Sequence, residues 1–149
     1  LGAKYISKQD YDKFNIRSGV NYGDILLPMI GTIGNPIIVN IPDDKIDFAI
    51  KNVALIKFFN NSKVTNIYIK NLFDSDYFEN AIFQNKRGGT QKFIALSDIR
   101  KMEIEVPPLE LQNQFADFVK QIDTQKNEIQ NSLEQMQKLQ ESLMNKYFE

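Results

Sequence analysis

The sequence contains neither cysteine nor histidine. Without thiols the chain can form no disulfide bond, and without thiolates or imidazoles it lacks the ligands of most protein zinc sites. Nucleophilic catalysis by cysteine and the usual pairing of serine with histidine are excluded as well. A chain without cysteine fits a reducing compartment, so we expect a cytoplasmic protein.

Long hydrophobic runs are also absent. No run approaches the roughly 20 apolar residues that span a bilayer, so we expect no membrane partner. The start, Leu1-Gly2-Ala3, has no signal-peptide pattern and no initiator methionine, and we expect residue 1 to be an interior point of a longer protein. With 42% hydrophobic and 25% charged residues, the 149-residue chain suits one domain with a core, or one domain plus an extended element.

Charge is distributed unevenly along a chain whose net charge is only −1. Residues 1–108 hold 14 basic and 12 acidic side chains, whereas residues 109–149 hold 4 and 7. Within residues 86–101 there are five basic side chains (Lys86, Arg87, Lys92, Arg100 and Lys101) against the single acid Asp98. Residues 109–149 are therefore poorly suited to binding phosphate, whereas residues 86–101 are suited to it.

Pro107-Pro108 marks a boundary between two kinds of sequence pattern. Before it, short apolar runs at Ile25-Leu26-Leu27 and Ile37-Ile38-Val39 predict buried strands, and residues 49–59 predict a third. Residues 64–69 fit either a strand or the entry to a helix, and residues 72–85 have helical spacing up to the break at Gly88-Gly89. We further expect Ser97 to cap a short turn over 98–102, and residues 102–106, which alternate apolar and acidic, to form a half-buried strand.

The last 41 residues contain neither glycine nor proline and carry a heptad pattern. Apolar residues recur at every seventh position, and two more stand at the matching d positions; the candidate helix-pairing residues are Phe115, Phe118, Ile122, Ile129, Met136, Leu139 and Leu143. A helix with so long an apolar face is marginal alone, so we expect a partner helix rather than one folded back on its own domain. The fold class predicted is α+β, with a β-containing domain at 1–108 and a long coiled-coil helix at 109–149.

Several short motifs, in this order, resemble one half of a type I restriction-modification specificity subunit. They are Tyr22-Gly23-Asp24-Ile25-Leu26-Leu27, Gly31-Thr32-Ile33-Gly34, Asn52-Val53-Ala54-Leu55, Arg87-Gly88-Gly89-Thr90-Gln91 and Ile104-Glu105-Val106-Pro107-Pro108-Leu109-Glu110, followed by the closing helix. The match extends over about 130 residues. It departs from the family after Pro108, where Glu-Gln is usual, and at the front, where family domains have several tens of further residues.

The resemblance implies a target-recognition domain, N-terminally incomplete here, that reads one half of a split site in double-stranded DNA. It further implies an antiparallel partner helix, from the same full-length subunit or from a homodimer. The paired helices would set the spacing of the half-sites and dock adenine-N6 methyltransferase (modification) subunits, which use S-adenosylmethionine, and a restriction subunit joins for cleavage. This chain itself would need no cofactor.

The segment at residues 85–92 is the strongest candidate for DNA contact. Its glycine pair allows close approach to phosphate, while Lys86, Arg87 and Lys92 can neutralise phosphates, and Arg87 can instead bind guanine. Gln91 can pair with adenine or brace the turn, and Thr90 stands between it and the glycines. The alternative is a solvated turn with no DNA contact.

The turn Gly31-Thr32-Ile33-Gly34-Asn35-Pro36 is read first as a structural connection between two strands. It lacks the Lys-Ser/Thr pair of a phosphate-binding loop. Thr32 and Asn35 remain secondary candidates for DNA contact. The scattered lysines Lys45, Lys51, Lys57, Lys63 and Lys70 are assigned to solvated faces.

Catalytic motifs are incomplete throughout the sequence. Val106-Pro107-Pro108-Leu109 lacks both the polar and the aromatic end of the amino-methyltransferase motif, and Pro suits the first turn of a helix. Pro42-Asp43 lacks the separate acidic-x-Lys pair of metal nucleases. We therefore expect that the chain is not an enzyme and has no metal site. Two alternatives to a specificity subunit stay open: a protein-assembly module built on the helix, or the recognition domain of a fused restriction-methylation enzyme.

Overall fold

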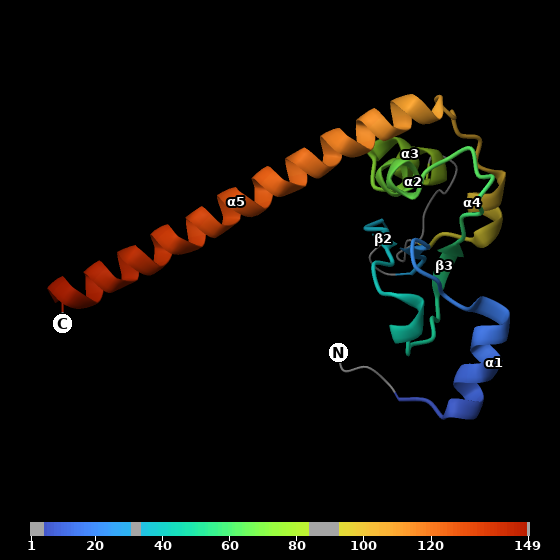
Figure 1. Cartoon of the computed structure of the whole chain (residues 1–149), viewed down its shortest axis with the longest axis horizontal. Helices are drawn as coiled ribbons and strands as arrows, with labels where there is room; N and C mark the ends of the chain where they lie inside the picture. The colour runs from blue at the N-terminus through green and yellow to red at the C-terminus, as the bar shows by residue number, and fades with distance from the viewer. Residues whose placement is uncertain (1–4, 31–33, 84–92, 149) are drawn as a thin grey trace. The chain divides into compact units, whose positions relative to one another are not determined.

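The computed structural model describes residues 5–30, 34–83 and 93–148. Its elements are α1 (Lys8–Ser18), β1 (Ile25–Pro28), β2 (Ile37–Ile38), the 3-10 helix η1 (Asp43–Lys45), β3 (Val53–Ile56), α2 (Asn66–Phe73), α3 (Asp76–Phe83), α4 (Leu96–Lys101) and α5 (Leu109–Phe148) (Figure 1). A small antiparallel sheet combined with helices confirms the α+β class. The chain divides into two compact units, Leu1–Leu109 and Glu110–Glu149, beside the two consecutive prolines.

The sheet has three antiparallel strands in the order β2-β1-β3. Its central strand alternates in burial, with Ile25 and Leu27 fully buried on one face, as expected for a strand with one face in the core. The strand predicted at 25–27 is confirmed as β1. The strand predicted at 37–39 is confirmed only over Ile37–Ile38, and it is not buried there, because Ile37 is exposed and Ile38 is half-buried. The strand predicted at 49–59 is confirmed only over Val53–Ile56, because Asn52, with φ of 62°, turns the backbone immediately before it.

The hydrophobic core lies between the sheet and the two helices α2 and α3. Each helix contributes a pair of buried side chains at i and i+4, Ile69 with Phe73 and Phe78 with Ile82. The rings of Phe73 and Phe78 meet with centroids 4.6 Å apart. In Figure 1, α2 and α3 lie above the strands, and α1 lies below them, beyond the lower end of β3.

Side-chain hydroxyls determine where α2 begins and where α3 separates from it. The Thr65 hydroxyl accepts a hydrogen bond from the Tyr68 amide at 3.3 Å, so the ambiguous segment 64–69 enters a helix. The helical spacing over 72–85 is confirmed by α3 (Asp76–Phe83), although the segment is not one continuous helix. Ser75 interrupts it, because its hydroxyl donates to the Leu72 carbonyl at 2.6 Å and accepts from the Phe78 amide at 3.4 Å.

Two local predictions were wrong. Ser97 lies inside α4 rather than capping a turn, because the helix starts one residue earlier and the Asp98 carboxylate accepts from the Ala95 amide at 3.4 Å. Residues 102–106 form no strand. Met102 and Ile104 are half-buried against the core, as their alternation indicated, but the segment is held by the Tyr68 hydroxyl, which donates to the Glu105 carbonyl at 2.7 Å.

The long helix predicted after the prolines is confirmed as α5, which has 40 residues. At about 1.5 Å per residue, its length is roughly 60 Å.

Candidate nucleic-acid interface

Most of the residues predicted to contact DNA lie outside the described part of the chain. Lys86, Arg87, Thr90, Gln91 and Lys92 are in this group, as is Thr32. Asn35 is described: its side chain is exposed and its backbone is left-handed, with φ of 53°, directly after Gly34 with φ of 91°. Consecutive left-handed residues turn the chain sharply into β2, which supports the structural reading of this turn and leaves the Asn35 side chain accessible.

The residues that border the two predicted DNA segments pair with each other. Ile30, which precedes the turn at 31–36, forms an isolated antiparallel bridge with Phe93, which follows the segment at 85–92. The Ile94 amide donates to the Met29 carbonyl at 2.9 Å, which makes Ile30 and Phe93 a pair without direct hydrogen bonds, the kind whose side chains stand closer. The end of one candidate segment is therefore joined to the start of the other.

The side chains at this junction alternate between the core and the surface. Ile94 is a core residue and Met29 packs against the core, whereas Ile30 and Phe93 are 56% and 55% exposed. Sequence reasoning missed the junction. The only signal was the run Phe93-Ile94, which is too short for a strand to be predicted from it.

The motif Tyr22-Gly23-Asp24 has a structural role at the entry to β1. Gly23 has φ of 83°, a conformation that favours glycine, and its carbonyl accepts from the Asn66 side chain at 3.1 Å. The Asp24 side chain is buried and accepts from the Asn21 amide at 2.8 Å. Backbone bonds from Gly23 to Val39 and from Val39 to Asp24, both 2.8 Å, tie this turn to the β2 side of the sheet.

Lys57 is held by this turn. Its Nζ lies 3.0 Å from Asp24 Oδ2 and 2.7 Å from Asn21 Oδ1. The ammonium group of Lys57 is therefore paired with a buried carboxylate.

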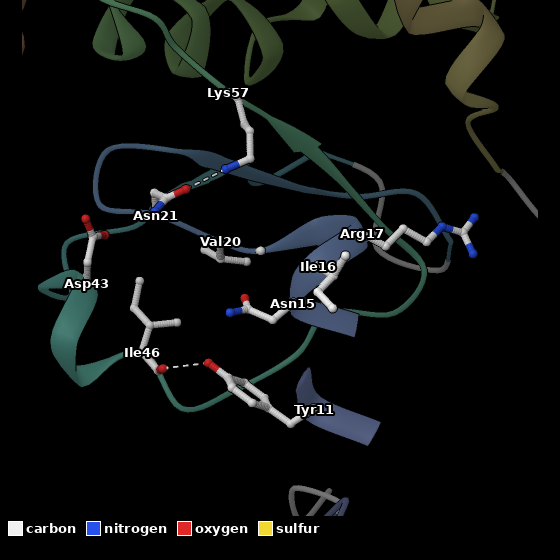
Figure 2. Close-up of a pocket in the computed structure, with 10 residues that line it drawn as sticks. Tyr11, Asn15, Ile16, Arg17, Val20, Asn21, Asp43, Ile46 and Lys57 are labelled. Carbon is white, nitrogen blue, oxygen red and sulfur yellow. Dashed lines mark hydrogen bonds between the residues drawn. The ribbon is translucent and has the colours of Figure 1, made fainter. Parts of the chain in front are cut away.

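A polar cavity of about 400 Å³ lies between α1, η1 and Lys57. Figure 2 shows the Tyr11 hydroxyl donating to the Ile46 carbonyl, a bond of 2.9 Å that ties α1 to the segment after η1. The Arg17 guanidinium points away from Lys57 and Asn21 (Figure 2). The two cations at this cavity therefore do not converge on one anion, and we assign the cavity no ligand.

The second unit carries a different kind of surface. Along α5, most of the predicted helix-pairing residues are exposed: Phe115, Phe118, Ile129, Met136, Leu139 and Leu143, with Ile122 half-exposed. Near the end of the helix, Met136, Leu139 and Leu143 border an almost wholly apolar groove together with Tyr147. The heptad positions thus form an apolar stripe along α5, interrupted at Gln125 and Ser132, that no described residue of this unit covers.

The described residues contain no group of three or more acidic side chains placed to hold a metal ion. Nor does any helix in residues 5–30, 34–83 and 93–148 have the length and apolar character to cross a membrane.

The comparisons with known proteins agree with the motif order. The family model of the type I restriction modification DNA specificity domain matches residues 3–138, which covers both the sheet-containing unit and most of α5. The chain belongs to this family and has a specificity role in type I restriction-modification. No curated protein matches the chain.

Proposed function

We propose that this chain recognises one half of a bipartite site in duplex DNA and directs the methyltransferase and restriction subunits of a type I complex to it. The DNA-contacting residues are those of the segment 85–92, assisted by Thr32 and Asn35. The chain itself carries out no catalysis and holds no cofactor.

The bridge between Ile30 and Phe93 is the observation that carries this proposal. It pairs the residue before 31–36 with the residue after 85–92. These two segments are far apart in the sequence, and each is polar and contains glycine. Recognition of a few adjacent base pairs needs contacts from more than one loop at one place, and this pairing supplies a common base for two.

Local charge supports the same surface. Between residues 80 and 97 the only charged side chains are Lys86, Arg87 and Lys92, and between 25 and 42 there are none. The sequence next to the two bridge residues therefore carries basic and no acidic side chains, in a chain whose net charge is −1. A cluster of basic residues of this kind suits phosphate binding, which is driven by counterion release.

The α5 stripe supports the assembly part of the proposal. Seven apolar heptad positions along a helix of 40 residues suit pairing with one antiparallel helix, from the same full-length subunit or from a second copy. The pair of helices then serves as the spacer between two recognition domains and as the docking surface for the modification subunits.

The test is equilibrium binding of fluorescent duplex DNA at several salt concentrations. Replacing Lys86, Arg87 and Lys92 together by alanine should weaken binding to every sequence. It should also reduce the slope of log affinity against log salt by about 0.9 for each phosphate that the variant no longer neutralises.

The matched control removes the same charge from α5. Lys120, Lys126 and Lys138 are exposed on a helix whose unit is acidic overall, and their replacement by alanine should leave the salt slope unchanged. If the two triple variants behave alike, segment 85–92 is not at the DNA.

A second candidate function rests on the exposed stripe alone. In that case the chain is an assembly module that joins subunits through α5 and never contacts DNA. Salt-dependent binding of duplex DNA by the wild-type chain discriminates the two, because an assembly module would show none.

A further inference from the structure

The sheet has a second apolar face, opposite the core. Residues that stand directly opposite each other in neighbouring strands project to the same face, and on this face every described partner is apolar. The pairs are Leu26 with Ile37, Leu26 with Leu55, Pro28 with Val53, and Ile30 with Phe93. None of these residues belongs to the core cluster.

Exposure on this face is greatest at its borders. Ile37 is 60% exposed, and Ile30 and Phe93 form the exposed pair already described. Because Ile94 is buried in the core and bonded to Met29, the Phe93 ring is presented from a fixed backbone. A large apolar pair held this way is organised for contact with something other than water.

The surrounding charge indicates what that contact is. Lys92 directly precedes Phe93, and no acidic residue occurs in 80–97 or in 25–42. An apolar pair that is flanked in the sequence by a basic segment and an uncharged one suits the major groove of DNA, where phosphates flank the bases. The apolar group that bases present there is the C5-methyl of thymine, which aromatic and aliphatic side chains contact.

We propose that Ile30 and Phe93 read a thymine methyl group in the recognised half-site. This inference rests on the proposed function, since it needs the bridge to face DNA. It adds an apolar specificity contact to a set of candidates that were otherwise all polar or charged.

The experiment removes the methyl group from the DNA and the ring from the protein, separately and together. The full chain first selects its half-site from a random duplex library. Each thymine of that site is then replaced in turn by deoxyuridine, which lacks only the C5-methyl. Wild-type protein should lose about fourfold in affinity at one or two thymines, the worth of one buried methyl-sized group.

The Phe93→Ala variant should bind the thymine site more weakly and should no longer distinguish thymine from uracil at that position. Phe93→Leu should keep part of the discrimination. Phe59→Ala is the matched control, because Phe59 is 71% exposed in a turn outside the bridge, and it should discriminate as wild type does. Circular dichroism confirms that each variant is folded.

Several results would overturn the inference. Equal uracil effects in wild type and Phe93→Ala would show that the ring does not contact the methyl. Uniform weakening on all sequences would indicate a wedge or backbone contact, and unchanged DNA binding with altered subunit association would indicate a protein interface. A selected site without thymine would also overturn it. By contrast, the absence of any salt-dependent binding by wild type would overturn the proposed function itself.

Discussion

Lys57 and Asp24 form an ion pair, 3.0 Å between Nζ and Oδ2, in which the carboxylate is 6% exposed and the lysine side chain 36% exposed. Asp24 belongs to a motif that places the chain in its family, and Lys57 is one of several scattered lysines. Asp24 therefore has a structural role, because it closes the turn before β1 rather than facing a ligand.

Loss of Lys57 should therefore destabilise the fold. Lys57→Met leaves the buried Asp24 carboxylate with a single amide donor, and we expect a loss of about 1–3 kcal/mol in the free energy of unfolding. Lys70→Met is the matched control, because the Lys70–Asp74 pair is on the surface and should cost at most about 1 kcal/mol. Urea denaturation measures both, and equal losses would contradict a special role for the Asp24 pair.

The Tyr68 hydroxyl should anchor the segment that leads to α5. Tyr68→Phe removes its bond to the Glu105 carbonyl and should lower the free energy of unfolding by about 1 kcal/mol. Tyr77→Phe makes the same chemical change on an exposed side chain and should be nearly neutral. Thermal unfolding compares the two, and a neutral Tyr68→Phe would mean that the apolar packing of Met102 and Ile104 alone holds the segment.

Replacement of Gln91 should separate base reading from bracing of the turn. If its amide contacts adenine, Gln91→Ala should cost roughly 1–3 kcal/mol at one position of the site and relax the preference there. If it braces the turn, stability should fall while the preference stays the same. Binding across single-base variants, together with a thermal melt, distinguishes these outcomes; no change in either would remove Gln91 from the candidate site.

Charges placed in the α5 stripe should disrupt helix pairing. Replacing Ile122 and Ile129 by aspartate puts two charges into an apolar interface, so sedimentation velocity should show smaller particles. Asn127→Asp with Gln130→Asp adds the same charge on the opposite side of the heptad and should leave the particle size unchanged. A wild-type chain that is strictly monomeric at high concentration would refute self-pairing.

The purified chain should show no methyl transfer and no cleavage of DNA. The sequence has no histidine, no cysteine, and no complete methyltransferase or nuclease motif. Incubation with duplex DNA, S-adenosylmethionine and magnesium, followed by assays for methylated adenine and for strand breaks, checks this. Activity that copurifies with the protein and disappears in a folded variant would contradict it.

The sequence alone determined the features that depend on local pattern. The absence of glycine and proline after Pro108, with apolar residues every seven positions, was enough to predict α5, because a helix forms from contacts three and four residues apart. The apolar runs at 25–27 and 37–39 were enough to predict the positions of β1 and β2, although not the exposure of Ile37. The order of the short motifs was enough to identify the family.

Only the tertiary structure decided which distant residues meet. The bridge between Ile30 and Phe93 depends on the register at the end of β1, which the packing of Ile94 in the core selects. The pairing of Asp24 with Lys57 likewise requires β1 and β3 to lie side by side. Residues 102–104 have the alternating burial of a strand, although Val106 is exposed and the segment forms no strand. A strand also needs a partner, and whether a partner edge is free depends on the whole fold rather than on the local sequence.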